Sequence, residues 1–463
     1  MTADNSPLGV PSTSGSHTGA MRFALIVILL FGLVLRLGLA FVHGLSATPQ
    51  LNGDEDECDT YAWNLAQGQG YRGMSPDIPD RNHLTAWRPP GASLLMAGIF
   101  ATVGHRYDAV RIVHCILGTC SIWMTFLIGR RTFNATVGLI GATIYALYPL
   151  AVLQSTELLS EPLGVFLFLV FINGVLAFSQ RPTWYRALFA GLVLGVGLLT
   201  RANYVMMIPL TVVWLVWQYR TNWRVVLKGV AIVAVALAIL APWTIRNYRV
   251  FGAFVPFSTG GGSVLLQGNN SVVVSDPKYY GYNVWDTTLP EYREALQTAG
   301  NEVERDRRAR QFAIQWLKDH PDKWGFLLWH KFLRSWTPLL IDNPSAAQRW
   351  IYLLSWGPIL VLFILAIGPT AYIGLRYRHS VLFLHLAILH YVVNSLIFFA
   401  LVRYRAPIDP LCVILASATL TWIAYRIGYR QVGNPFSVPK TIASTGQPMR
   451  ATVSLPLPSG HTT

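Results

Sequence analysis

Five carboxylates lie close together in one polar stretch of the chain. They are Asp54, Glu55, Asp56, Glu57 and Asp59. A carboxylate of such a group can act as a general base or as a metal ligand. An acidic run is also the ordinary sequence of a solvated loop, so both interpretations stay open from these residues alone.

Arginines stand near the ends of apolar segments where they could face this acidic run. They are Arg36, Arg88, Arg201, Arg246, Arg334, Arg403 and Arg405, with Arg36 inside the first apolar segment and long enough to reach outward. Anchoring to lipid headgroups would explain each arginine singly. Several of them around one acidic segment favour an anion site, because a guanidinium group matches a phosphate with two hydrogen bonds.

Other short motifs narrow the chemistry. Glu157 and Glu161 add two carboxylates, and Glu161 precedes Pro162, a pair that also suits the first turn of a helix. The glycine-rich stretches 259–263 and 268–270 are not followed by Lys-Ser or Lys-Thr, so they are not a nucleotide P-loop. Tight turns and close approach to a substrate explain them equally well. HExxH, paired CxxC and GxSxG motifs are absent from the sequence, which gives zinc and serine-hydrolase chemistry no support.

The composition predicts the elements that position these residues. Of 463 residues, 53% are hydrophobic and 13% are charged, which indicates a membrane protein rather than a soluble one. The net charge of +14 could indicate nucleic-acid binding, but most arginines lie at the ends of apolar segments, as the positive-inside rule requires. The cysteines show neither metal nor disulfide spacing. They are Cys58, Cys115, Cys120 and Cys412.

Ten apolar segments have lengths that suit membrane helices. They cover residues 23–42, 109–129, 135–151, 158–178, 187–199, 204–217, 225–241, 351–375, 381–401 and 407–425. Residues 91–103 would extend only about 20 Å as a helix, so we expect them to lie at the surface or to re-enter the membrane without crossing it. The first segment follows a polar start and is expected to remain as an anchor. The sequence therefore predicts an all-α polytopic membrane protein.

Basic clusters predict the orientation of these segments. The clusters are Arg130 and Arg131, Arg181 and Arg186, Arg220, Arg224 and Lys228, Arg376 and Arg378, and Arg426 and Arg430. If all of them are cytoplasmic, the polar segments 44–90 and 244–350 lie outside, together with the short turns at 154–161, 200–203 and 403–406. Within the second polar segment, 289–318 and 323–336 are predicted helices. We expect cytoplasmic disordered tails at residues 1–21 and 431–463.

Several short motifs also follow one another along the chain in a specific order. They are Gly53-Asp54-Glu55 with Ala62, Leu65, Gly68, Gly70 and Tyr71; Trp87-Arg88-Pro89-Pro90-Gly91; Ser160-Glu161-Pro162; Leu199-Thr200-Arg201; Pro242-Trp243-Thr244-Ile245-Arg246-Asn247-Tyr248; Phe251-Gly252; Gly268-Asn269-Asn270; and Arg403-Tyr404-Arg405-Ala406-Pro407-Ile408-Asp409-Pro410. From residue 22 to residue 430 the chain resembles the bacterial membrane glycosyltransferases of the GT-C fold, which are related to protein O-mannosyltransferases and aminoarabinose transferases. That family has seven helices before its second large outer segment, and the charge-based topology has the same number.

The resemblance implies an inverting glycosyltransferase in a bacterial cytoplasmic membrane, with its active site facing the periplasm or the exterior. The donor would be a sugar on a polyprenyl phosphate, and the acceptor an envelope glycan, lipid or protein. The protein would contact membrane lipid and no nucleic acid. A nucleotide site is not needed, because the lipid donor is already activated, and neither a cofactor nor a metal ion is expected.

The resemblance also assigns roles to residues. It makes Asp54 the catalytic base with Glu55 beside it. The donor phosphate would be bound by arginines at the outer ends of the helices, namely Arg201, Arg246, Arg403 and Arg405. Arg88, Glu161 and Asn269 are then candidates for contact with the substrate. Cys58 stands where the family usually has an aromatic residue, so the register of the acidic run can shift by one or two residues.

Two other functions stay open. One is a membrane transporter or lipid flippase without transferase chemistry, and the other is an envelope-assembly protein with a degenerate site. A transporter more often places ionisable residues at the middle of the bilayer on broken helices. In this sequence most ionisable residues lie at the ends of the apolar segments that are predicted to face outward.

The orientation is tested with reporter fusions. Reporters after Gly129, Phe178 and Tyr429 should report cytoplasm, whereas reporters near Pro79 and Thr287 should report the exterior, because the basic clusters stay inside. A cytoplasmic signal at Thr287 would contradict the predicted topology and the outward-facing site.

Overall fold

The computed structural model describes residues 14–49, 53–75, 78, 80–219, 222–337, 345–377 and 380–436. Helices joined by turns and loops account for this part of the chain, which contains two isolated β-bridges and no strand. The predicted all-α fold is therefore confirmed.

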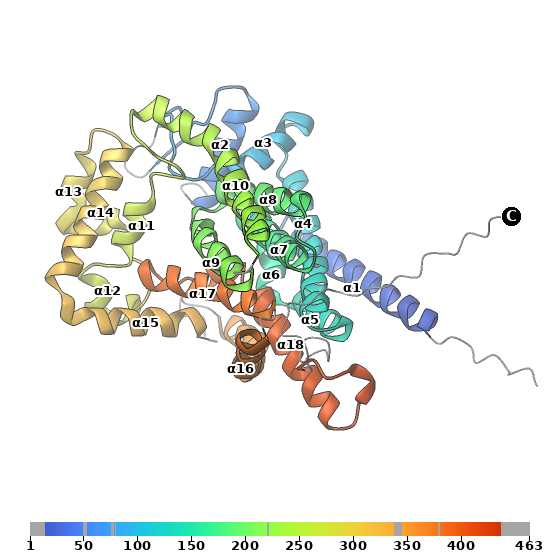
Figure 1. Cartoon of the computed structure of the whole chain (residues 1–463). Helices are drawn as coiled ribbons and strands as arrows, with labels where there is room; N and C mark the ends of the chain where they lie inside the picture. The colour runs from blue at the N-terminus through green and yellow to red at the C-terminus, as the bar shows by residue number, and fades with distance from the viewer. Residues whose placement is uncertain are drawn as a thin grey trace, which may run out of the picture.

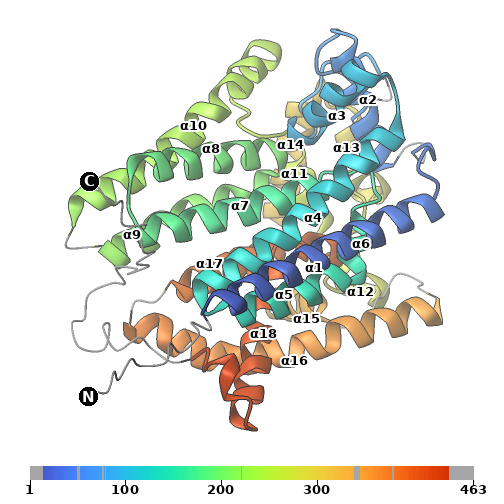
Figure 2. The same ribbon diagram turned by 90° about the vertical axis from the view of Figure 1, so that its right-hand side faces the viewer.

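Each of the ten predicted apolar segments contains helix. In chain order the helices are α1 (Ser14–Val42), α4 (Tyr107–Thr132), α5 (Ala135–Leu147), α6 (Pro149–Gln154), α7 (Glu161–Gln180), α8 (Trp184–Thr200), α9 (Met207–Tyr219), α10 (Trp223–Phe251), α16 (Ala346–Tyr377), α17 (Val381–Ile397) and α18 (Asp409–Arg426). By length and composition, five helices of the described residues could cross a membrane, namely α1, α4, α7, α10 and α16, whereas α5, α8 and α17 are apolar but shorter. Figure 2 shows α1, α4, α7 and α8 running side by side in one bundle, and α16 packs against α17 and α18.

The two long polar segments lie at one end of this bundle (Figures 1 and 2). The first forms α2 (Asp54–Ala66) and α3 (Gly91–Val103), and the second forms α11 (Gly261–Gln267), α12 (Val272–Ser275), α13 (Pro290–Gln297), α14 (Glu302–Asp319) and α15 (Trp324–Trp336). The predicted helix at 289–318 is divided into α13 and α14, because the side chain of Asn301 accepts a hydrogen bond from Glu304 N and starts a new helix. The second predicted helix, 323–336, corresponds to α15.

Three of the predicted basic clusters lie together at the other end of the bundle, namely those at 130–131, 181–186 and 224–228. Arg131 Nη1 donates to Gln180 Oε1 at 3.0 Å, and Lys228 Nζ donates to Pro182 O at 3.0 Å. These hydrogen bonds bring together the end of α4, the turn between α7 and α8, and the start of α10. Two residues of the clusters lie outside the described residues, namely Arg220 and Arg378.

The boundaries of the predicted tails need correction. Helix α1 begins at Ser14, so residues 14–21 are helical. A helix that an apolar segment has nucleated adds further residues at little cost, which explains the extension. At the other end residues 431–436 are described, and Phe436 packs against the main hydrophobic core. The remaining parts of the two tails lie outside the described residues, namely 1–13 and 437–463.

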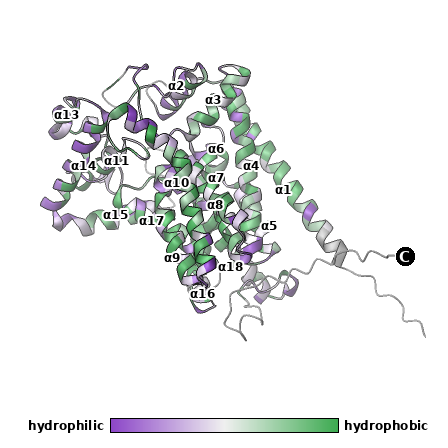
Figure 3. Cartoon of the chain, turned by 45° about the horizontal axis from the view of Figure 1, so that its top comes forward, coloured by the Kyte–Doolittle hydropathy of each residue, from purple (hydrophilic) through white to green (hydrophobic). Residues whose placement is uncertain are grey.

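Glycines let the bundle helices approach closely. A Cβ atom on Gly191 of α8 would lie 2.6 Å from Ile232 O of α10, and a Cβ atom on Gly138 of α5 would lie 2.6 Å from Phe126 O of α4. Small residues at helix contacts are typical of membrane bundles, where packing rather than exclusion of water holds the helices together. Apolar side chains also cover the outward faces of α1, α10 and α16, as expected for a surface in contact with lipid (Figure 3).

Candidate active site

The acidic run is the first turn of helix α2. Gly53 is the residue before the helix, and the first turn contains Asp54, Glu55, Asp56 and Glu57. Acids are favourable there because the N-terminus of a helix carries a partial positive charge. Successive residues project about 100° apart around a helix, so the four carboxylates face different neighbours. The direction of each side chain therefore separates site residues from structural ones.

Two of the four acids hold the outer layer together. Glu55 Oε1 accepts a hydrogen bond from Leu158 N at 2.8 Å. Both oxygens of Asp56 accept from the guanidinium group of Arg81, at 3.1 and 2.9 Å. Neither acid lines the cavity described below. Glu55, which the family resemblance placed beside the base, supports the turn before α7 instead.

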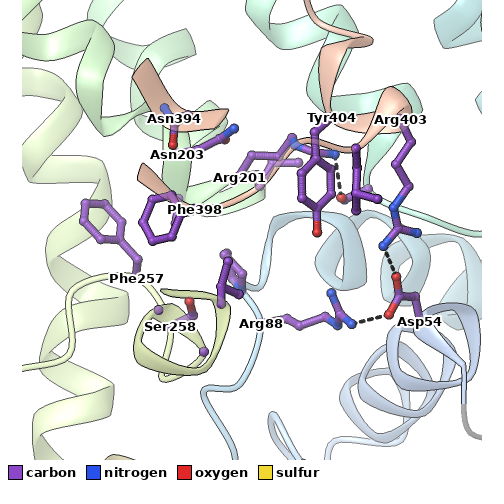
Figure 4. A pocket seen from close by; sticks show the side chains of 18 of the residues that line it. Asp54, Arg88, Arg201, Asn203, Phe257, Ser258, Asn394, Phe398, Arg403 and Tyr404 are labelled. Atoms are coloured by element: carbon purple, nitrogen blue, oxygen red, sulfur yellow. Dashed lines mark hydrogen bonds and ion pairs between the residues drawn. The ribbon is translucent and has the colours of Figure 1, made fainter. Parts of the chain in front are cut away.

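Asp54 lies between two arginines (Figure 4). Arg88 Nη2 donates to Asp54 Oδ1 at 2.6 Å, and Arg403 Nη2 donates to Asp54 Oδ2. Burial raises the pKa of Asp54, but the charges and hydrogen bonds of Arg88 and Arg403 outweigh burial and lower that pKa to about 2. Asp54 is therefore ionised at neutral pH, and it is a weak base while both ion pairs are intact.

The loop that carries Arg88 is fixed from two sides. Glu302 of α14 accepts a hydrogen bond from Ala86 N at 2.6 Å, which ties the second outer segment to the first. On the other side, a Cβ atom at Gly91 would lie 2.8 Å from Leu199 O, so only glycine lets α3 begin against the end of α8. Arg88 itself also donates through Nε to Glu57. The sequence motif around Arg88 thus encodes a fixed guanidinium position.

A second charged group forms where α7 begins and α8 ends. Arg201 Nη1 lies 3.3 Å from Glu161 Oε1 and donates to Ser160 Oγ at 3.2 Å. Arg403 Nε lies 4.0 Å from the same Glu161 oxygen. The guanidinium groups of Arg201 and Arg403 stand 5.6 and 5.4 Å from the centroid of the Tyr404 ring. Arg403 therefore links Glu161 to Asp54.

These side chains line one cavity of about 450 Å³. Five predicted site residues lie in its lining, namely Asp54, Arg88, Glu161, Arg201 and Arg403. Phe257, Phe398 and several amide side chains form the opposite side (Figure 4). The volume is within the range of small-ligand sites, roughly 300 to 1,000 Å³. The cavity thus combines a charged side with a neutral side.

Arg246 and Asn269, which the family resemblance implied as site residues, have structural partners. Arg246 Nη1 donates to Thr85 O at 2.7 Å and Nη2 donates to Tyr71 O at 2.9 Å, so Arg246 holds the first outer segment against α10. Asn269 donates to the backbone at the end of α17 and accepts from Lys331 Nζ at 2.8 Å. Neither residue is part of the cavity lining.

Arg405 also lies apart from the cavity, although only Tyr404 separates it from Arg403. Its side chain is 0% exposed, and its Nε donates to Asp409 Oδ1 at 2.6 Å. Its guanidinium group lies 3.5 Å from the ring centroid of Trp356. This arginine is enclosed in the bundle, so it has a structural role.

Arg36 does not reach outward, contrary to the expectation from sequence. Its side chain is 0% exposed, and Nη1 donates to Gly32 O at 3.0 Å and Ala146 O at 3.2 Å. Ala146 lies just before the break between α5 and α6, where Pro149 cannot continue the hydrogen bonds of the helix. A buried backbone carbonyl in a membrane needs a donor, and Arg36 provides it.

Four amide residues of the cavity were not found from the sequence. They are Asn203, Gln267, Asn283 and Asn394. A weak signal existed for two of them, because Asn203 follows Arg201 by two residues and Asn394 is an amide inside an apolar segment. Glu57, the second partner of Arg88, was also missed, although its spacing of three residues from Asp54 puts both carboxylates on one face of a helix.

Comparison with known proteins gives a family match and several structural matches. A model of the family described as dolichyl-phosphate-mannose-protein mannosyltransferase matches residues 87–245. The apo oligosaccharyltransferase of Archaeoglobus fulgidus is 13% identical, with 92% of this chain and 54% of that chain covered and a TM-score of 0.57. The A. fulgidus oligosaccharyltransferase AglB in complex with an inhibitory peptide and a dolichol-phosphate is also 13% identical. The match covers 92% of this chain and 53% of that chain, with a TM-score of 0.53. ArnT from Cupriavidus metallidurans bound to undecaprenyl phosphate is 14% identical. The match covers 89% of this chain and 81% of that chain, with a TM-score of 0.41. No curated protein sequence matches this chain.

These matches identify the fold. The likeness to the oligosaccharyltransferase shows that this membrane protein has the GT-C fold of membrane glycosyltransferases, so the resemblance predicted from the motif order is confirmed. The range matched by the mannosyltransferase family includes three charged residues of the cavity lining, namely Arg88, Glu161 and Arg201. The chain spans about half the length of the oligosaccharyltransferase.

The structural role of Arg405 is tested by comparing a single and a double variant. Arg405→Met leaves the buried Asp409 carboxylate without its ion pair, which costs about 3 to 5 kcal/mol, so the thermal unfolding temperature in detergent should fall sharply. Arg405→Met with Asp409→Leu should recover much of the loss, because apolar replacement of both partners is often neutral. The control is Arg106→Met, which removes a side chain that is 63% exposed. An unchanged unfolding temperature in Arg405→Met would return Arg405 to the candidates for donor binding.

Proposed function

We propose that this protein transfers a sugar from a polyprenyl phosphate to a glycan, lipid or protein acceptor of the cell envelope. The observation that carries the proposal is the carboxylate of Asp54, held between Arg88 and Arg403 in the cavity. The family match points to the same chemistry, since its description names a dolichyl-phosphate-linked mannose donor. One oligosaccharyltransferase of the same fold was solved with a dolichol-phosphate.

The donor phosphate is assigned to Arg201 and Arg403. Both guanidinium groups flank the Tyr404 ring and face the cavity. A phosphate accepts paired hydrogen bonds from guanidinium groups more strongly than from neutral donors. In the low-dielectric site these arginines would also stabilise the charge that develops on the leaving phosphate.

Donor binding would also activate the base. With both ion pairs intact, the pKa of Asp54 is about 2, which is far below the range suited to a base at neutral pH. A phosphate that takes over the guanidinium of Arg403 removes one of the two charges that lower this pKa. The pKa of Asp54 then rises, and the carboxylate becomes free to accept a proton. The site is therefore basic only when the donor is present.

The reaction is a displacement at the anomeric carbon. Asp54 accepts the proton of an acceptor hydroxyl while the hydroxyl oxygen forms a bond to the anomeric carbon. The bond from that carbon to the phosphate oxygen breaks, and the polyprenyl phosphate leaves on the opposite face with the bonding electrons. The configuration of the sugar is inverted. Neither a metal ion nor a nucleotide enters this scheme.

The active site is assigned to the outer face of a bacterial cytoplasmic membrane. The cavity lies among the outer segments, and three of the basic clusters lie at the other end of the bundle, where α4 and α7 end and α10 begins. The positive-inside rule places such clusters in the cytoplasm. A lipid-linked donor suits the outer face, where nucleotide sugars are absent.

Donor binding is tested with Arg201→Ala and Arg403→Ala. Each variant should weaken use of the lipid donor while the protein still folds and inserts, because a guanidinium contact to the phosphate is lost. Lys variants should recover only part of the loss, since an ammonium group lacks the paired geometry. The measurement is the dependence of sugar transfer on donor concentration, with Arg106→Ala as the control. Unchanged donor kinetics in both Ala variants would reassign these arginines to lipid headgroup contacts.

The base is tested with Asp54→Asn, which keeps the shape of the side chain but cannot accept the proton. General-base catalysis contributes about 10² to 10⁴ in rate, so turnover should fall at least about a hundredfold. Donor binding should be retained or tightened, because Arg403 loses a competing carboxylate. The controls are Glu55→Gln and Asp56→Asn, whose side chains have structural partners. Full turnover in all three variants would contradict base catalysis by this helix turn, and would favour a transporter.

The pH dependence is predicted from Glu157, which lies in the turn before α7. Burial and the charge of Glu161 raise the pKa of Glu157 to about 7. Glu157 is neutral below this pH and negatively charged above it, where it repels an anionic donor. The apparent affinity for the donor should therefore fall as the pH rises through about 7. Glu157→Gln should abolish this dependence, and a dependence that persists in the variant would assign it to another group.

A further inference from the structure

The neutral side of the cavity has an unusual content of amide groups. Asn203, Gln267, Asn283 and Asn394 line it together with the rings of Phe257 and Phe398. In Figure 4, Asn203 and Asn394 lie beside each other, on the opposite side of the view from Asp54. A ligand on this side would therefore meet uncharged amide groups and aromatic rings.

These amides have hydrogen-bonding capacity that the protein does not use. Asn394 donates twice through Nδ2, to His390 O and Met206 Sδ, so its Oδ1 is left for another partner. The Oδ1 atom of Asn203 is buried and has no hydrogen-bond partner among the described residues. Buried polar atoms are almost always satisfied in folded proteins. Each of these two side chains therefore keeps an oxygen that no protein group satisfies.

A second pair of amides shows the same feature. Asn283 Nδ2 donates to Gln267 Oε1 at 3.4 Å, which leaves Gln267 Nε2 as a donor and Asn283 Oδ1 as an acceptor. Gln267 is only 3% exposed and Asn394 only 8%, so these are buried groups rather than surface ones. The neutral side thus presents spare donors and spare acceptors together.

Hydroxyl groups match this arrangement. A hydroxyl donates one hydrogen bond and accepts others, so a ligand rich in hydroxyls satisfies amide donors and acceptors at once. An isoprenoid chain would leave the amides unsatisfied, at the cost of burying polar groups without partners. The apolar faces of a sugar ring can pack on Phe257 and Phe398. The neutral side therefore suits a sugar better than a lipid tail.

The charges of the cavity restrict which sugar fits. The carboxylates in its lining are Asp54 and Glu161, and both are paired with arginines. The arginines of the lining belong to the same ion pairs. A charged sugar on the neutral side would lose hydration without gaining a counter-charge, which is costly.

The position of the amides relative to Arg201 identifies which group reaches them. Asn203 follows Arg201 by two residues, so their Cα atoms are at most about 7 Å apart. In a polyprenyl-phosphate donor a single oxygen joins the sugar to the phosphate. Because Arg201, Asn203 and Asn394 line the same cavity, a phosphate at Arg201 keeps the attached sugar within the cavity that the amides line.

We propose that Asn203 and Asn394, supported by Gln267 and Asn283, bind the sugar of the donor, and that this sugar is uncharged. The inference rests on the proposed function, because it places the donor phosphate at Arg201. It goes further by naming the class of sugar and the residues that select it. An amino sugar or a uronic acid is predicted to be a poor donor.

The test compares three ligands that share one short polyprenyl phosphate. The first is the bare phosphate, the second carries mannose or glucose, and the third carries glucosamine. Binding to the purified full chain in nanodiscs is followed by tryptophan fluorescence, since Trp87 and Trp285 line the cavity. The neutral sugar should tighten binding about tenfold, as expected for one or two net hydrogen bonds, whereas glucosamine should not.

The matched variants isolate the sugar contacts. In Asn203→Ala with Asn394→Ala, the affinity for the ligand with the neutral sugar should fall to that of the bare phosphate, whose own affinity should not change. The control is Asn173→Ala, which removes an amide of α7 that lies outside the cavity lining and contacts Met124. An unchanged affinity for the bare phosphate also shows that the double variant is folded.

Several outcomes would overturn the proposal. If the neutral sugar adds no affinity, or if glucosamine adds more, the neutral subsite is wrong while donor binding through the phosphate still stands. An equal loss of affinity for the bare phosphate in the double variant would assign the two amides a structural role. If none of the ligands binds, both the subsite and the proposed function fail.

Discussion

Ion pairing of Asp54 with Arg88 and Arg403 is the interaction on which the site depends. Asp54 begins α2, whereas Arg403 lies between α17 and α18, 349 residues further along the chain. Arg403 also approaches Glu161 at the start of α7. Buried charges in a membrane bundle are stable only when they are paired. The requirement for pairing therefore draws three distant helix ends to one place.

The neighbouring contacts show how the outer layer keeps this arrangement in place. A Cβ atom at Gly268 would lie 1.9 Å from Phe398 O, so the backbone after α11 touches the backbone after α17 directly. Lys331 of α15 donates to Leu396 O at 3.2 Å and to Asn269 Oδ1 at 2.8 Å. The positive charge suits the C-terminal end of α17. These contacts with the outer layer thus hold the segment that carries Arg403 in position.

The sequence predicted the helices well, because the length of an apolar segment is a local property. The site depends instead on the direction in which each side chain points, which is set by the packing of distant segments. Arg403 and Arg405 belong to one motif, yet one faces the cavity and the other is enclosed beside Asp409. Asp54 and Glu55 are adjacent, but they point to different partners because successive side chains project in different directions from a helix. The spacing of helical side chains could have separated these acids if α2 had been predicted to begin at Asp54. The amides were missed because an unpaired oxygen becomes visible only when its neighbours are placed.

The contact between the two outer segments has a consequence for protein engineering. Ala86 O accepts a hydrogen bond from Thr259 N at 2.9 Å, and Ala86 N donates to Glu302, so one residue of the first segment is held at both ends by the second. A chimera that exchanges only one of these segments would have to form both bonds between segments from two different proteins. Transplanting specificity therefore requires both segments to be moved as one unit, together with the end of α10 that Arg246 ties to the first segment.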